Sequence, residues 1–129
     1  MGHLPGPASA IRRLVPAVHE SYELTRQTVL EAGLVDGSIK ELCYGYLAGE
    51  SDTTDFGKLE ERERVALEWA DAIAFDSARA DDDLWARLHA QFSEPELVDL
   101  GCAIGFELGQ QHWRRTIGLP VREDTSRPD

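Results

Sequence analysis

The sequence contains only two cysteines, Cys43 and Cys102, and they form neither a Cys-x-x-Cys pair nor a zinc-ligand cluster with histidine. Both lie in apolar stretches, where a free cysteine usually acts as a small hydrophobic side chain. No glycine-rich loop follows a strand, as nucleotide-binding motifs require. We therefore expect no structural disulfide, no metal and no other cofactor.

Long apolar runs are also missing. Residues 1–7 lack the apolar run of a signal peptide. The longest apolar stretch, residues 97–108, contains Asp99 and Glu107 and is too short and too charged to span a bilayer. These features predict a cytoplasmic protein with reduced thiols and no association with membranes.

Basic residues are scarce. The chain has 13 lysines and arginines against 24 aspartates and glutamates, and its formal net charge is −11. A field of this sign repels nucleic-acid phosphates and anionic membrane surfaces. The pairs Arg12-Arg13 and Arg114-Arg115 are too small to form a basic patch, so nucleic acid is not an expected partner.

The length of 129 residues fits one domain. Residues 1–10 are rich in glycine and proline and are expected to form a flexible N-terminal segment. Residues 11–120 should form a single helical domain, and the polar residues 121–129 a flexible C-terminal tail. No segment shows the alternation of a strand over a useful length.

Apolar residues recur at spacings of three and four, which predicts α-helices. The expected helices are residues 14–32, 37–48, 60–75, 82–91 and 94–117. In the first of them, Pro16 suits the first turn, Gly33 suits the C-terminal stop, and one face should be buried. The expected buried stripe is Val15, Val18, Tyr22, Thr25 and Val29. Short connections predict antiparallel neighbours in a compact all-α bundle of about five to six helices.

The last predicted helix is apolar on nearly every side over residues 97–108, so it should be central. Gly101, Gly105 and Gly109 recur at four-residue spacing and share one face. Each glycine costs about 1 kcal/mol relative to alanine inside a helix. The line therefore indicates a close approach, either by another helix of this chain or of a second copy, or by a ligand for which it forms the floor of a pocket.

Three motifs occur in order along the chain: Lys-Glu-Leu at residues 40–42, Arg-Glu-Arg at 62–64, and Phe-Ser-x-x-Glu-Leu-Val-x-Leu at 92–100. Together they resemble the carboxymuconolactone decarboxylase-like family, which includes the alkyl hydroperoxidase D type. The resemblance covers roughly residues 14–120. It implies an all-helical, alkyl hydroperoxidase D-like fold that assembles with itself as symmetric trimers or hexamers.

Redox members of that family use a glutamate, a Cys-x-x-Cys pair and a histidine. Glu41 matches the glutamate, but residues 52–57 stand where the cysteines and the histidine should follow, and they contain neither. Two-cysteine chemistry needs one thiolate to attack and a second thiol to resolve the product. This departure therefore argues against a two-cysteine peroxidase or disulfide reductase.

Decarboxylase members need no cysteine. They need a general acid to protonate the developing enolate and cations to hold the carboxylates of the substrate. In these members an Asn-Arg pair often lies near the end of the last helix. The spacing back from residues 118–120 places that pair on Gln111 and His112, which are polar but do not match it.

The first functional hypothesis is a divergent member that acts on or binds a small organic acid or lactone. Glu41 and His112 would be its acid and base, since histidine titrates near neutral pH. Gln111 would orient the ligand, and Gly105 and Tyr46 would line the pocket.

Two alternatives stay open. One is a non-catalytic helical oligomer that has kept the fold and lost the site. The other is a one-cysteine thiol peroxidase or redox sensor that uses Cys43, with Lys40 and His112 as the basic groups that would lower its thiol pKa.

Overall fold

The computed structural model describes residues 3–50 and 56–122, and within these ranges the chain is helical and contains no strand. Its α-helices are α1 (Ala8–Arg13), α2 (Pro16–Thr25), α3 (Gly37–Leu47), α4 (Glu61–Phe75), α5 (Asp82–Gln91) and α6 (Glu94–Thr116). The prediction of an all-α bundle of five to six helices is confirmed for this part of the chain. Most of the predicted loop at residues 50–55 and of the predicted tail lies outside the described residues. None of the described helices is long and apolar enough to cross a membrane.

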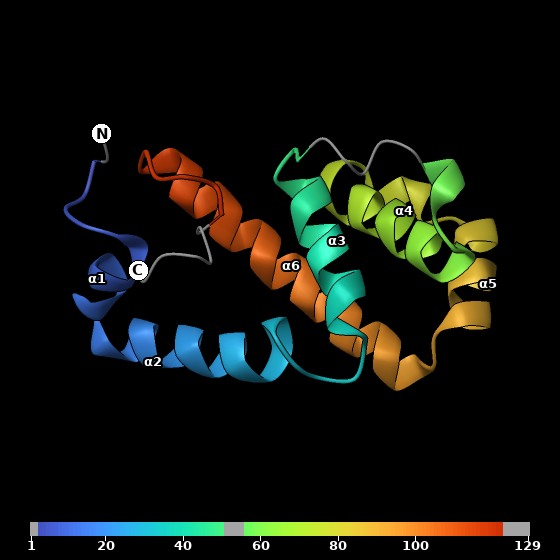
Figure 1. The fold of residues 1–129 in the computed structure, drawn as a ribbon, viewed down its shortest axis with the longest axis horizontal. Helices are drawn as coiled ribbons and strands as arrows, with labels where there is room; N and C mark the ends of the chain where they lie inside the picture. The colour runs from blue at the N-terminus through green and yellow to red at the C-terminus, as the bar shows by residue number, and fades with distance from the viewer. Residues whose placement is uncertain (1–2, 51–55, 123–129) are drawn as a thin grey trace.

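Three short helical segments join these helices: the π-helical segment η1 (Arg26–Leu30) and the 3-10 turns η3 (Phe56–Lys58) and η4 (Ser77–Arg79). Helix α6 runs diagonally through the molecule, and α3 crosses in front of it in Figure 1. Helices α3 and α4 both pack against α6, and α5 packs against α4. On the other side, η1 carries the α1–α2 pair to α6. The fold thus has two parts built on one central helix.

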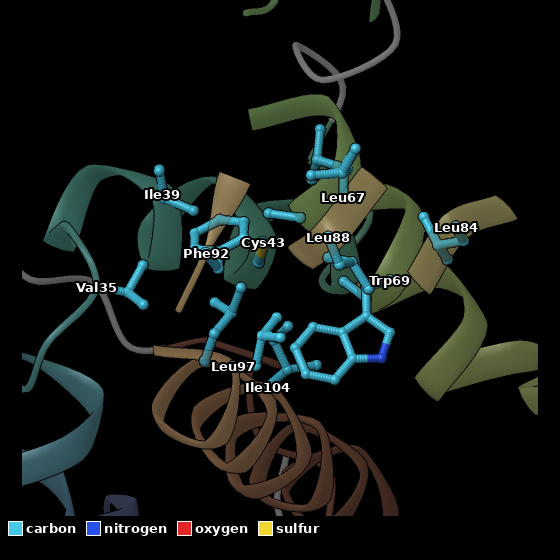
Figure 2. Close-up of a cluster of buried hydrophobic side chains, with 14 of the residues drawn as sticks. Val35, Ile39, Cys43, Leu67, Trp69, Leu84, Leu88, Phe92, Leu97 and Ile104 are labelled. Atoms are coloured by element: carbon cyan, nitrogen blue, oxygen red, sulfur yellow. The ribbon is translucent and has the colours of Figure 1, made fainter. Parts of the chain in front are cut away.

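The main core lies between α3, α4, α5 and α6. Figure 2 shows its side chains meeting from these helices, with Trp69 directed toward α6. The core residues labelled there are Val35, Ile39, Cys43, Leu67, Trp69, Leu84, Leu88, Phe92, Leu97 and Ile104. A smaller cluster of Leu30, Tyr44 and Ala103, joined by Val29 and Phe106, connects η1 to α6.

The N-terminal helix differs from the prediction. The expected helix at residues 14–32 is interrupted at Val15, whose extended backbone (φ −127°, ψ 98°) is what a following proline favours, and α2 begins at Pro16. The expected buried stripe is also wrong, since α2 buries none of its residues. Val15 and Val18 are 53% and 49% exposed. Among the described residues, α6 covers this face only in part: the Tyr22 ring lies 5.9 Å from that of Phe106, while Val15 and Val18 stay about half exposed.

At both ends, the described structure extends beyond the predicted domain at residues 11–120. Helix α1 begins at Ala8, before the expected boundary at residue 11, because Ala8 and Ile11 are buried. The backbone N–H of His3 donates to the carbonyl of Ile117. At the other end, Arg122 is held by three carboxylates, although it falls in the predicted tail.

Helix α6 begins as its sequence predicts. The Ser93 side chain accepts from the backbone N–H of Glu96, and the Glu96 carboxylate accepts from the N–H of Ser93, which completes a capping box. Of the three glycines on α6, Gly101 permits a close approach, since a Cβ there would lie 2.7 Å from the Trp69 ring. Among residues 3–50 and 56–122, a Cβ at Gly105 or Gly109 would meet no atom within 4 Å. Their face of the helix is therefore open.

A buried ion pair fixes the connection between η1 and α3. Lys40, whose side chain is 0% exposed, places its ammonium 2.9 Å from the carboxylate of Asp99 on α6. The ammonium also donates to the carbonyls of Val29 and Ala32, at 2.6 and 2.5 Å. Asp99 in turn accepts from the backbone N–H groups of Leu34 and Val35.

This arrangement satisfies each buried charge with several hydrogen bonds, as buried ions require. Burial alone would raise the pKa of Asp99, but the bonds from Lys40, Val35 and Leu34 outweigh it and lower that pKa. Gly33 adopts a φ of +91°, and a Cβ there would collide with both charged groups. The connection can therefore take this path only with glycine at that position.

We predict that Lys40→Met lowers the free energy of unfolding by about 3–5 kcal/mol, because it leaves Asp99 buried without its cation. Arg79→Met is the matched control. Arg79 pairs with Asp71 but is 60% exposed, so its loss should cost at most about 1 kcal/mol. Urea unfolding measures both. Equal, small decreases in the free energy of unfolding of the two variants would show that the buried pair does not hold the connection between η1 and α3.

Candidate functional site

A polar cavity lies where α1, η1, α3, α6 and the segment after α6 meet. Its volume is about 100 Å³. Its lining includes the arginines Arg12, Arg114 and Arg122, the carboxylates Glu41 and Glu107, and the Tyr44 ring. Positive and negative side chains thus share one small, partly enclosed space.

Glu107 is the most perturbed carboxylate of the cavity. It projects from the middle of α6, and its side chain is only 14% exposed. Burial raises its pKa above the ordinary 4.5, and the bond from Gln111 and the charge of Arg122 only partly oppose that rise. A carboxyl group whose pKa is moved toward neutrality, and which lines a cavity, is a candidate acid and base.

Gln111 fixes the orientation of Glu107. Its amide nitrogen donates to the Glu107 carboxylate at 2.9 Å and to the backbone carbonyl of Tyr44 at 3.1 Å. The side chain of Gln111 is almost fully buried, and its carbonyl oxygen has no hydrogen-bond partner among the described residues. Gln111 therefore ties α6 to α3 directly behind the candidate acid.

Arg122 closes the cavity from the segment after α6. Its guanidinium lies 2.5 Å from the Glu41 carboxylate, 3.2 Å from that of Glu50 and 3.9 Å from that of Glu107. Gly45 leaves the space that Glu50 needs, since a Cβ there would lie 2.6 Å from its carboxylate. Three carboxylates from two distant parts of the chain therefore compete for one cation.

Arg12 and Tyr44 also line the cavity. Arg12 stacks its guanidinium 3.5 Å from the centroid of the Tyr22 ring and donates to Gln110 at 3.0 Å. The Tyr44 hydroxyl donates to the carbonyl of Leu30 at 3.0 Å, and burial raises its pKa. Tyr44 therefore acts as a neutral wall that joins α3 to η1.

The structure brings together two of the residues that the sequence singled out. Glu41 lines the cavity, although its side chain is 60% exposed and bound to Arg122. Gln111 lies behind the cavity and contacts its acid. His112 is not among the lining residues; it is exposed on α6 and lies 3.4 Å from Arg115. One chain therefore does not supply Glu41 and His112 to the same cavity.

The remaining predicted residues lie elsewhere. Tyr46 donates to Asp71 and lines a separate hollow between α3, α4 and α5. Gly105 is exposed on the open face of α6. Cys43 is 0% exposed in the main core, and burial raises its thiol pKa to about 12. These conditions are the opposite of those that give a reactive thiolate. The exposed cysteine, Cys102, is not part of the cavity.

Residues 3–50 and 56–122 contain no group of three or more histidine, cysteine, aspartate or glutamate side chains that could hold a metal ion. No protein-family model, curated protein or solved structure matches the chain.

Sequence reasoning missed Glu107 and Arg122. Glu107 was interpreted only as a charge that keeps residues 97–108 out of a membrane. A sequence signal was present, because a carboxylate on a helix that is apolar on nearly every side must be buried, and Gln111 lies one turn further on the same face. Arg122 gave no such signal, since its partner Glu41 lies far away in the sequence.

We predict that the stability of the protein falls as the pH rises from about 4.5 through the raised pKa of Glu107. In that window the folded protein keeps a proton that the unfolded chain has released, so deprotonation disfavours the fold. Glu107→Gln should remove this fall, so the free energy of unfolding of the variant should increase relative to that of the wild type as the pH rises. Denaturant unfolding at several pH values measures the effect, with the exposed Glu20→Gln as control. A difference in the free energy of unfolding between Glu107→Gln and the wild type that stays constant with pH would contradict this prediction.

Proposed function

We propose that the protein binds a small organic acid in the polar cavity and exchanges a proton with it through Glu107. The observation that carries the proposal is the buried carboxyl group of Glu107, which faces the same cavity as Arg12, Arg114 and Arg122. Guanidinium groups match a carboxylate in charge and shape. A protonated Glu107 can share its proton with a bound carboxylate, which leaves one negative charge for the two groups.

In this proposal Glu41 is not the acid or base that the sequence indicated. Because it is mostly exposed and bound to Arg122, it is the carboxylate that an incoming acid can displace. Glu107 then replaces the pair of Glu41 and His112 as the group that carries the proton. The one-cysteine alternative has no comparable support, since Cys43 lies in the core.

The three sequence motifs support a resemblance to the carboxymuconolactone decarboxylase-like family. We propose that the protein is a divergent cytoplasmic member of it, with its proton carrier on α6. In this interpretation the Lys-Glu-Leu motif has a structural role, since Lys40 forms the buried ion pair with Asp99. Its glutamate, Glu41, faces the cavity from the next position.

We predict that Arg122→Gln weakens the binding of acetate and succinate about tenfold or more, because a charge-assisted bond is lost. Glu41→Gln should strengthen binding by up to about fivefold, because an exposed carboxylate no longer competes for Arg122. NMR titration gives both affinities, and Arg115→Gln, an exposed arginine on α6, is the matched control. A purely structural Arg122 would not yield tighter binding in Glu41→Gln, so an unchanged affinity there contradicts the proposal.

Self-association is the second part of the proposal. Helix α2 buries no residue within the chain, while Leu14, Val15 and Leu24 on and beside it are 67%, 53% and 64% exposed. Short helices depend on tertiary packing for their stability. A second copy that covers these side chains would provide it, in a symmetric homo-oligomer such as a trimer or hexamer.

We predict that Leu24→Asp shifts the protein toward monomers in sedimentation velocity, because a charge is unfavourable in an apolar contact. Gln27→Asp adds the same charge at an exposed polar position of η1 and should leave the distribution unchanged. Identical monomeric profiles for the wild type and both variants would exclude association through α2.

A further inference from the structure

A second, larger hollow adjoins the polar cavity. It is a groove of about 610 Å³ between α2 and α6. Ala17 and Val18 form one wall, and Phe106 and Trp113 form the other. Its volume lies within the range of about 300–1,000 Å³ that is typical of sites for small organic ligands.

Gly109 opens one side of the groove. It lines the hollow, and a Cβ at this position would meet no atom of the described residues within 4 Å. Within that part of the chain, the glycine therefore makes no close contact that would explain its cost in a helix. It leaves free a space that a longer side chain would occupy.

The groove and the polar cavity share residues. Both are lined by Arg12, Tyr22 and Gln110. The Arg12 guanidinium stacks on the Tyr22 ring and donates a hydrogen bond to Gln110. One cationic group thus stands where the polar and the apolar hollows meet. The two hollows are therefore adjacent at Arg12.

The volumes of the two hollows indicate which part of a single ligand each of them can hold. The polar cavity, at about 100 Å³, accommodates a head group, whereas the groove is about six times larger. We propose that the ligand is an amphipathic carboxylic acid, with its carboxylate in the polar cavity and its aliphatic chain in the groove between α2 and α6. This inference rests on the proposed function and specifies its ligand class.

Charge complementarity favours this occupant over a helix of a second copy. A carboxylate can bind the guanidinium groups that line the polar cavity, including Arg12 and Arg122, whereas an apolar helix offers them no anionic group. The apolar lining then meets only methylene groups, so affinity should rise with chain length. Each buried methylene should strengthen binding about three- to fourfold until the groove is filled.

The test is an NMR titration of the full chain with acetate, hexanoate and decanoate, each below its micelle concentration. We expect the affinity to rise steeply along this series, and 1-decanol, which lacks the carboxylate, to bind at least about tenfold more weakly than decanoate. If acetate binds and the longer acids bind no better, the groove is not the chain site, although the proposed function stands. If no acid binds, the proposed function and this inference both fail.

A pair of glycine variants locates the chain. Gly109→Leu should weaken decanoate binding at least about tenfold and leave acetate binding unchanged, because the new side chain fills the groove. Gly105→Leu is the control, since Gly105 has the same open space on the same helix but does not line the groove. Leucine also favours the helix over glycine, so both variants should fold.

Two results would overturn the assignment of the groove. One is an unchanged affinity of Gly109→Leu for decanoate. The other is a wild-type oligomer that Gly109→Leu, but not Gly105→Leu, dissociates in sedimentation velocity, which would show that a second copy occupies the groove.

Discussion

The buried pair of Lys40 and Asp99 determines how the two parts of the molecule fit together. The last turns before α3 expose the carbonyls of Val29 and Ala32, which have no helical donors of their own. Lys40 supplies these donors from α3, and Asp99 on α6 neutralises it. One ammonium group therefore fixes η1, α3 and α6 relative to each other. The cavity depends on this, because the Tyr44 hydroxyl reaches the carbonyl of Leu30 only when η1 lies there.

Local signals in the sequence predicted the helices that pack in the core. The starts and ends of α3, α4, α5 and α6 agree within one or two residues with the predicted ranges, because caps, glycine stops and apolar spacing act over a few residues. The helix at residues 14–32 failed for a different reason. Apolar spacing shows that a helix has an apolar face, but it does not show whether another element of the same chain buries that face. Val15 and Val18 have the spacing of a core helix and remain half exposed.

The candidate site was predictable only in part for a related physical reason. Glu41 and Gln111 could be proposed because the motifs around them gave each a place in the sequence. The contacts that make the cavity join residues across the chain, such as Arg122 with Glu41 and Gln111 with Tyr44. No local pattern encodes these pairs. The burial of Cys43 likewise follows from packing among four helices, and it is this burial that raises the thiol pKa.

The arginines of the cavity also explain how a chain with a net charge of −11 could attract an anion. At physiological ionic strength, charges beyond about 8 Å are largely screened, so nearby groups decide the binding. Arg122 is already largely removed from water and already holds carboxylates. In the proposed function, a bound acid replaces one carboxylate with another and adds little desolvation of the cation, so its affinity is expected to be modest. The bound anion would raise the pKa of Glu107 further, because two negative charges in so small a space repel each other.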